Sequence, residues 1–244
     1  MIKKPLFGRK RRENCSIAII INAYYSAPQY IAQSLRLKEE FEKLGATADI
    51  VRNDGFFGRI DNDNIKTYFG NYSACVFLDK DKYLSEMLEM SGITIFNSHK
   101  TIVDCDDKMT TYIRLAGNGV SIPKTLPGLL CYNPYEQIRE QTIAIIENQL
   151  GYPLVVKECY GSQGSGVYPV FDRGQLYSAM ERVKLKPHLI QRMITSSLAK
   201  DVRVIVIGGK AVGAMLREGS DGFHSNVGQG GRGSAYSLSA SFRD

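Results

Sequence analysis

Short β-branched runs alternate with helical segments over the first half of this 244-residue chain. Between the runs, residues 30–44 and 82–90 carry a helical periodicity, and each segment stops at a nearby glycine, Gly45 or Gly92. Four runs have the length and residue types of strands, at residues 16–22, 47–51, 74–78 and 93–96. This alternation is typical of an open α/β sheet, so residues 15–103 are expected to form a Rossmann-like domain.

The second half of the chain has a different pattern, which begins after Pro123 and Pro127. A helix is expected over residues 135–150, then two strands around a glycine-rich loop, and residues 189–216 are typical of strands. Apolar residues three and four apart mark two more helices, one that begins near Asp106 (Met109, Tyr112, Ile113, Ala116) and one that contains Leu176, Ala179, Met180 and Val183. This order of elements predicts an α+β architecture.

The segment VRVIVIGGKAVGAML predicts a β-hairpin that turns at Gly208 and Gly209. Asp201 and Arg203 lie two apart on its first strand, so their side chains share one face. Each side chain either points into a site or pairs with an opposite charge on the neighbouring strand, and the sequence leaves both options open. The glycines of residues 228–233 that follow predict a flexible, polar end.

Several classes of protein are disfavoured by what the chain lacks. No apolar run approaches the roughly 18 to 20 residues of a membrane span, and no G-x-G-x-x-G follows the first strand, which argues against a dinucleotide site. The five cysteines are far apart and form no C-x-x-C pattern, which indicates reduced thiols in a cytoplasmic protein without structural zinc. The three histidines are equally scattered, so neither a histidine metal site nor a Ser-His-Asp triad is expected.

The positive charge of the chain is concentrated at its N-terminus. Six of the 31 basic residues precede the first acidic one, and the remainder balance the 25 acidic residues. Residues 1–14 therefore form a basic tail. We favour a solvated, disordered terminus over contact with nucleic acid, because blocks of like charge repel and usually stay disordered.

The stretch KECYGSQGSGVYPV, which starts at Lys157, places three glycines and a lysine between two strand-like runs. It lacks the G-x-x-x-x-G-K-[ST] pattern that leads into a helix, so it is no Walker loop. A glycine loop between strands suits a lid over phosphates, because glycines adopt positive φ and their N–H groups can approach phosphate oxygens closely. Lys157 needs an anion or a cleft, since it follows the apolar run LVV. The alternative to a phosphate-binding loop is a glycine-rich hairpin in which the lysine side chain extends to the solvent.

These motifs occur in an order that resembles the ATP-grasp superfamily, and within it the RimK-type α-L-glutamate ligases. The resemblance covers residues 77–233 in the series FLDKD, FNSHKTIVDCDDKMTTYIRLAGNGVSIPKT, PLVVKECYGSQGSGV, LIQRMI, DVRVIVIGGKAVGAMLRE and SNVGQGG. It implies an ATP-grasp fold with a Rossmann-like pre-ATP-grasp domain, a central α+β lobe at residues 104–187 and an incomplete C-terminal lobe at residues 188–244. It also implies that ATP binds between the two lobes and that a carboxylate is joined to an amine through an acyl phosphate.

The resemblance assigns nucleotide-binding roles residue by residue. Lys108 and Lys157 match the two lysines that grip the phosphates, where two cations balance part of the triphosphate charge. Asp201 matches a residue on the strand face that, in the family, points into the site. The phosphate-covering loop corresponds to Gly161, Ser162, Gln163, Gly164, Ser165 and Gly166, and the adenine-contacting linker to Gln191, Arg192, Met193 and Ile194.

Three further residues match positions near the reacting groups and are the expected catalytic residues: Arg203, Arg217 and Asn226. Arg203 would stabilise charge near the γ-phosphate as the phosphoryl group moves. Arg217 and Asn226 would lie near the transferred phosphate and the substrate; from the residues alone, each could equally be a surface residue. No side-chain nucleophile is required, because the protein acts by placing the substrates and by stabilising charge on the transferred group.

Two departures from the family pattern concern specificity. Arg192 stands where an acidic residue commonly follows the linker glutamine, and His224 stands where an arginine often precedes S-N. The first affects adenine contacts and the second the pocket for an acidic substrate. The expected partners are ATP and an amino acid, with glutamate as the first candidate, while the carboxylate acceptor is left open. Neither a membrane nor nucleic acid is an expected partner, and the oligomeric state is open, a homo-oligomer included.

The magnesium ligands of the family, a late-strand acidic residue and an E-x-N segment, are expected beyond Asp244, so no metal ligand is assigned within the chain. We expect these 244 residues to be a fragment of a longer ligase and not a truncated, non-catalytic nucleotide-binding module tethered through its basic tail.

Overall fold

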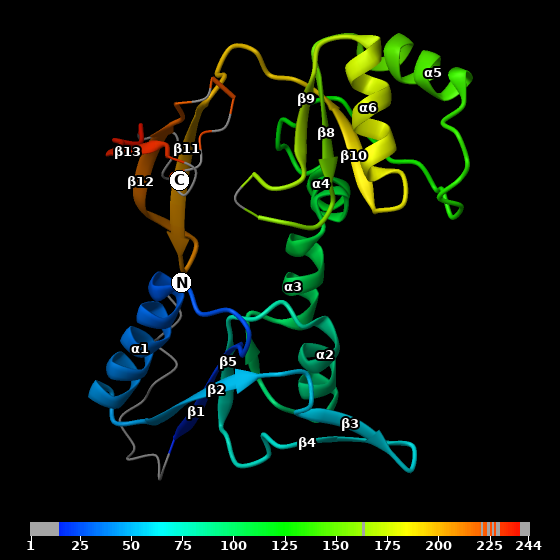
Figure 1. Cartoon of the computed structure of the whole chain (residues 1–244). Coiled ribbons are helices and arrows are strands. Elements are labelled where there is room, and N and C mark those ends of the chain that lie inside the picture. The colour runs from blue at the N-terminus through cyan, green and yellow to red at the C-terminus, as the bar shows by residue number, and fades with distance from the viewer. Residues whose placement is uncertain are drawn as a thin grey trace. The chain divides into compact units, whose positions relative to one another are not determined.

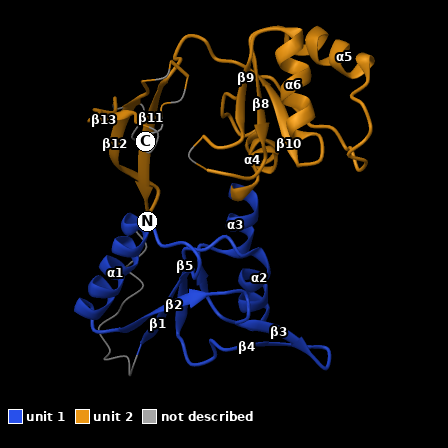
Figure 2. Ribbon diagram, in the orientation of Figure 1, with its two compact units in different colours: residues 1–105 blue, residues 106–244 orange. Residues whose placement is uncertain are grey.

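The chain divides into two compact units, residues 1–105 and 106–244 (Figures 1 and 2). The structure is a computed structural model that describes residues 15–162, 164–220, 222–223, 225, 227 and 230–239. The basic tail at residues 1–14 lies outside the described residues. Among the helices that the structure describes, none combines the length and the apolar character that a membrane crossing needs.

The first unit is built on a parallel sheet with the strand order β2-β1-β5-β6. Its strands are β1 (Ser16–Asn22), β2 (Thr47–Asn53), β5 (Ala74–Phe77) and β6 (Ile95–Phe96), and its helices include α1 (Pro28–Lys43) and α2 (Lys82–Met90). Alternate residues of β1 face opposite sides, so Ile19 packs in the cluster with α1 and Ile20 in the cluster with α2. A central strand buried on both faces explains the continuous apolar run of its sequence. The predicted α/β architecture is confirmed for this half.

Two features of the first unit were not predicted from the sequence. A hairpin of β3 (Gly58–Asp61) and β4 (Asn64–Thr67) turns at Asn62 and Asp63, which have φ values of 48° and 60°. Asparagine and aspartate tolerate this left-handed conformation, so the N-D pair was the available signal. Helix α3 (His99–Asp106) is the second such feature, and the helix expected to begin near Asp106 is α4 (Lys108–Leu115), which belongs to the second unit. Asp107 is the N-cap of α4, and its carboxylate accepts from the N–H groups of Met109 and Thr110.

The second unit contains an antiparallel sheet with the order β7-β10-β8-β9, which is packed against two helices. The elements are β7 (Thr125–Pro127), α5 (Glu140–Leu150), β8 (Leu154–Glu158), β9 (Val167–Val170), α6 (Arg173–Val183) and β10 (His188–Arg192). The core combines α5, α6 and the residues on one face of the sheet, such as Val156 and Ile190. The helix predicted over residues 135–150 begins only at Glu140. Strand β10 pairs with both β7 and β8, so this sheet extends beyond the lobe boundary expected after residue 187.

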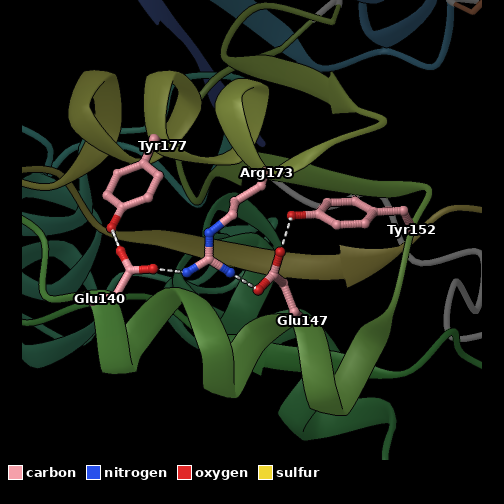
Figure 3. A network of polar contacts seen from close by, with 5 residues as sticks. All are labelled: Glu140, Glu147, Tyr152, Arg173 and Tyr177. Atoms are coloured by element: carbon pink, nitrogen blue, oxygen red, sulfur yellow. Dashed lines mark hydrogen bonds and ion pairs between the residues drawn. The ribbon is translucent and has the colours of Figure 1, made fainter.

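A polar network joins α5 and α6 on the helical side of the sheet (Figure 3). The Arg173 guanidinium, at the start of α6, bonds to Glu140 and Glu147, which lie two turns apart on α5. The Tyr177 hydroxyl also bonds to Glu140, and the Tyr152 hydroxyl donates to Glu147 at 2.9 Å. Burial and the neighbouring Glu147 carboxylate raise the pKa of Tyr152. The network fixes the pairing of the two helices whose apolar faces support the sheet.

A second sheet of the same unit contains β11 (Lys200–Ile207), β12 (Lys210–Glu218) and β13 (Arg232–Ala235). The predicted hairpin turn is confirmed, since Gly208 and Gly209 have φ values of 58° and 78° between β11 and β12. The prediction of a flexible end is wrong for residues 232–235, which pair with β12. Gly233 permits this close approach, because a Cβ at that position would lie 2.6 Å from the sulfur of Met215.

Candidate active site

The face of the β7-β10-β8-β9 sheet opposite the helices carries polar side chains. Because side chains alternate along a strand, Lys157 and Gln191 point away from the core that Val156 and Ile190 form. Next to this face is a pocket of about 600 Å³. Among the predicted site residues, it is lined by Lys108, Lys157, Gly164, Gln191, Arg192, Met193, Ile194 and Asp201. The structure therefore brings eight of the predicted residues together around one pocket.

Lys157 and Gln191 are in direct contact on adjacent strands. The Lys157 ammonium donates to the Gln191 side-chain oxygen at 2.6 Å. The same oxygen accepts from the Tyr112 hydroxyl at 3.3 Å, and the Gln191 amide nitrogen donates to the Thr125 hydroxyl at 2.8 Å. Gln191 is 3% exposed, so this contact anchors a cation at the edge of the pocket through a buried amide.

Lys108 lies at the first position of α4, directly after the Asp107 cap. Its ammonium donates to three carbonyl oxygens, those of Glu158 at 3.1 Å, Cys159 at 3.3 Å and Gly161 at 3.1 Å. Its backbone N–H also donates to the Cys159 carbonyl. Lys108 therefore holds the end of β8 and the first residues of the glycine loop, which places its positive charge at the base of that loop.

The glycine loop joins β8 to β9, as the sequence predicted. Gly161, Gly164 and Gly166 have φ values of 126°, 83° and 70°, so each adopts a conformation that favours glycine. Within the loop, the Ser165 N–H donates to the Ser162 carbonyl at 3.1 Å. Gln163 lies outside the described residues. The backbone geometry suits the close approach of N–H groups to an anion.

The base of the loop is fixed by Glu158, a residue that the sequence analysis missed. Its N–H donates to the Gly166 carbonyl at 2.7 Å, and its carboxylate accepts from Lys186 at 2.8 Å and from the Tyr168 hydroxyl at 3.2 Å. The hydrogen bond from Lys186, followed by that from Tyr168, outweighs partial burial and lowers the pKa of Glu158. No local pattern marks Glu158, because Lys186 is 28 residues away in the sequence.

The linker after β10 uses part of its backbone within the protein. The Arg192 N–H donates to the Lys124 carbonyl at 2.9 Å and the Met193 N–H to the Pro153 carbonyl at 3.2 Å. Met193 is buried, whereas the side chains of Arg192 and Ile194 are exposed beside the pocket. The assignment of this segment to adenine contacts stays a prediction.

Asp201 pairs across strands with Arg217, one of the two options that the sequence left open. The two residues are directly opposite on β11 and β12, and the guanidinium makes two hydrogen bonds to the carboxylate, of 2.6 and 2.7 Å. The Ser225 hydroxyl bonds to the same carboxylate. Burial alone would raise the pKa of Asp201, but the hydrogen bonds from Arg217 and Ser225 outweigh it and hold the pKa below its usual value.

The three expected catalytic residues are placed differently. The Arg217 side chain is 16% exposed and is held by Asp201, so it is not a surface residue. Arg203 is exposed on the face of β11 that carries Asp201, and the described residues that line the pocket do not include it. Asn226 and His224 lie outside the described residues. Their predicted roles stay predictions.

The residues present suit a nucleotide phosphate better than a metal ion. Two ammonium groups and a glycine loop with positive φ values match the charge and geometry of a polyphosphate. Within the described residues, no group of three or more histidine, cysteine or carboxylate side chains could hold a metal ion. Asp201 is occupied by Arg217 and Ser225. The described residues of this pocket therefore do not fit a magnesium ion.

A Rossmann-like domain is followed in the chain by an antiparallel sheet with two helices on one face and a glycine loop between two of its strands, and this combination defines a protein of the ATP-grasp type. The family model of the RimK-like ATP-grasp domain matches residues 105–244, and the chain belongs to this family. Solved structures confirm the predicted fold. The structure of a RimK domain ATP-grasp protein from Sphaerobacter thermophilus superposes on this chain with a TM-score of 0.62 and 19% sequence identity. The matched region covers 86% of this chain and 75% of that protein.

Curated relatives agree with the family. The chain is 34% identical over 164 residues to beta-citrylglutamate synthase B of Danio rerio. The matched region covers 66% of this chain and 39% of the relative. It is 35% identical over 158 residues to human N-acetylaspartylglutamate synthase A, covering 64% of this chain and 39% of the relative. It is 34% identical over 146 residues to a probable alpha-L-glutamate ligase of Maridesulfovibrio salexigens, covering 59% and 46%. The chain thus spans less than half of the length of these relatives.

Proposed function

We propose that this chain carries the ATP-binding site of a ligase that joins a carboxylate to an amine. The observation that carries the proposal is the pocket of the second unit, where Lys108, Lys157 and the glycine loop meet beside the Asp201–Arg217 pair. Polyphosphate is the ligand that this combination suits, because the site offers ammonium groups and backbone N–H groups and is open enough, at about 600 Å³, for a nucleotide. Membership of the RimK-like ATP-grasp family supports ATP as that nucleotide.

The proposed reaction has two steps. A substrate carboxylate oxygen attacks the γ-phosphorus of ATP in line, so that an acyl phosphate forms and ADP leaves. An amine then attacks the acyl carbon, phosphate leaves, and the amine nitrogen loses a proton as the amide forms. Neither step needs a protein nucleophile, so the residues act by placement and charge stabilisation.

The residues have separate roles in this proposal. Lys157 lies at the sheet face and balances phosphate charge, while Lys108 holds the base of the loop next to the same phosphates. The loop glycines supply N–H groups over the triphosphate. Arg217, held by Asp201, and Arg203 stabilise charge on the transferred phosphoryl group. Magnesium, when bound with ATP, supplies further charge neutralisation of the phosphate oxygens.

Glutamate is the proposed amine. The names of three relatives support this choice, since each contains glutamate: beta-citrylglutamate synthase B, N-acetylaspartylglutamate synthase A and a probable alpha-L-glutamate ligase. The carboxylate acceptor is a protein C-terminus, a peptide or a small metabolite, and these are the arms of a substrate screen.

Two measurements test the proposal. Calorimetric titration of the chain with ATP, with and without magnesium, should show binding that Lys157→Ala weakens by about tenfold or more, because a charge-assisted contact to phosphate is lost. Lys210→Ala is the matched control, since Lys210 lies at the exposed turn of the β11–β12 hairpin. Absence of ATP binding by the parent chain would refute the proposal.

The second measurement is ADP formation from magnesium-ATP with a pool of amino acids and carboxylates, and with glutamate omitted in parallel. Turnover that depends on glutamate would support the full proposal. ATP binding without turnover in any mixture would instead favour a nucleotide-binding module, and the absence of a metal-holding group among the described residues is the observation that keeps this candidate open.

A further inference from the structure

The amide of Gln191 is held by three groups from three different elements. Its oxygen accepts from Lys157 on β8 at 2.6 Å and from Tyr112 on α4 at 3.3 Å, and its nitrogen donates to Thr125 on β7 at 2.8 Å. Thr125 lies directly opposite Gln191 in the pairing of β7 and β10. An amide that is 3% exposed and has partners on both ends has one orientation available to it.

Thr125 determines which end of the amide faces Lys157. The Thr125 hydroxyl donates its single hydrogen to the Pro123 carbonyl at 2.8 Å, and a carbonyl can only accept. Thr125 can therefore only accept from Gln191, which requires the amide nitrogen on its side. The amide oxygen is then turned to the opposite side, toward Lys157.

Lys157 and Tyr112 complete the arrangement from the other end. An ammonium has three donors and no acceptor, so Lys157 is bound only if Gln191 presents its oxygen. The Tyr112 hydroxyl donates to the second lone pair of the same oxygen. A reversed amide would set the ammonium against an NH₂ group and the Thr125 oxygen against a carbonyl oxygen. Both ends therefore favour the same orientation.

We propose that Thr125 and Tyr112 are positioning residues that fix the Lys157 ammonium for phosphate binding, acting through Gln191. This inference rests on the proposed function, because it takes the phosphate of ATP to be the ligand of Lys157. Lys157 has four rotatable side-chain bonds, and ordering them on binding costs affinity. The buried amide orders the side chain in advance, so that this cost is removed from the binding step.

The test is ATP affinity by calorimetry in the whole chain. Thr125 is its main position, because Thr125 is not among the described residues that line the pocket, whereas Tyr112 is. Thr125→Val keeps the side-chain shape and removes the acceptor, so ATP affinity should fall by about threefold to tenfold. Thr125→Ser should restore parental affinity, because serine keeps the hydroxyl. Tyr112→Phe should weaken binding by a smaller factor, and Thr67→Val, in β4 of the first unit, should leave affinity unchanged.

A double-mutant cycle separates positioning from general stability. In a Lys157→Ala background, titrated to millimolar ATP, Thr125→Val should have no further effect on affinity, because the group that it positions is absent. An equal loss in both backgrounds would overturn the inference and assign Thr125 a structural role only. Parental affinity in Thr125→Val would also overturn it. No ATP binding by the parent chain would instead refute the proposed function, and the inference with it.

Discussion

Asp201 and Arg217 are direct cross-strand partners, and the carboxylate of Asp201 makes hydrogen bonds of 2.6 and 2.7 Å with the guanidinium of Arg217. The Arg217 side chain is only 16% exposed, so its charge is paired where water is scarce. Ser225 bonds to the same carboxylate. The contact of Ser225 with Asp201 connects the segment after β12 to β11 and β12, which carry the expected catalytic residues Arg203 and Arg217.

We expect Asp201→Asn to lower the free energy of unfolding by about 1 to 2 kcal/mol at pH 7, because it removes the charge partner of a mostly buried guanidinium. The expected loss is small because the Asp201 side chain is 37% exposed and solvent screens the pair. Urea unfolding measures the difference. The matched control is Glu218→Gln, which removes the neighbouring exposed pair with Lys200 and should cost less than about 0.5 kcal/mol.

The contribution of Asp201 should depend on pH. Its pKa in the folded chain lies below the ordinary 3.8, so its stabilising effect is fully present above that value and is lost as the pH falls through the folded pKa. The stability difference between the parent and Asp201→Asn should therefore be constant from pH 5 to 7 and shrink below about pH 4. A difference that stays constant to pH 2.5 would contradict this assignment.

His188 should make the chain less stable in mild acid. It is 3% exposed, its Nδ1 lies 2.7 Å from the Lys186 carbonyl, and its Nε2 accepts from the Leu129 N–H. Burial lowers the pKa of this imidazole from 6.5. Below pH 6.5 the unfolded chain takes up a proton that the folded chain resists, so stability falls as the pH falls from 7 to 5.

The measurement for His188 is thermal unfolding of the parent and His188→Gln as a function of pH. The melting temperature of the variant should decline less between pH 7 and 5 than that of the parent. Between pH 7 and 9 the imidazole is neutral in both states, so the two slopes should agree. Equal slopes in the acidic range would show that His188 does not resist protonation.

Gly166→Ala should lower the free energy of unfolding more than Gly209→Ala, although both glycines have positive φ. A Cβ at Gly166 would lie 2.9 Å from side-chain atoms of Glu158, whereas a Cβ at Gly209 would meet nothing within 4 Å. Both substitutions place alanine in a left-handed conformation, which costs about 1 to 2 kcal/mol. Gly166→Ala should cost about 1 kcal/mol more, because Glu158 must move from Lys186. Urea unfolding of both variants checks this, and equal losses would contradict it.

Cys159 should be inert to thiol reagents at neutral pH. Burial raises the pKa of its thiol to about 11, so the reactive thiolate is scarce as well as inaccessible. Cys105 is exposed and serves as the internal control. Brief treatment with iodoacetamide, followed by peptide mass spectrometry, should label Cys105 and leave Cys159 unmodified. Comparable labelling of Cys159 would show that the base of the glycine loop opens readily.

The sequence by itself determined the elements that local patterns encode. The strand Ser16–Asn22, the helix Lys82–Met90 and the hairpin turn at Gly208 and Gly209 have the predicted positions. Apolar periodicity, glycine stops and glycine turns act over a few neighbouring residues, so they do not depend on the rest of the chain. The order of the motifs also identified the family, which the comparisons confirm.

Only the tertiary structure decided which distant side chains meet. Strand alternation placed Asp201 and Arg203 on one face, but it could not select the pairing of Asp201 with Arg217, since that depends on the register of β11 and β12. Nor could it show that the Gln191 amide donates a hydrogen bond to Thr125, 66 residues away in the sequence. A strand has the same period of two whichever strand pairs with it, so the partners follow from register and burial, which the whole fold determines.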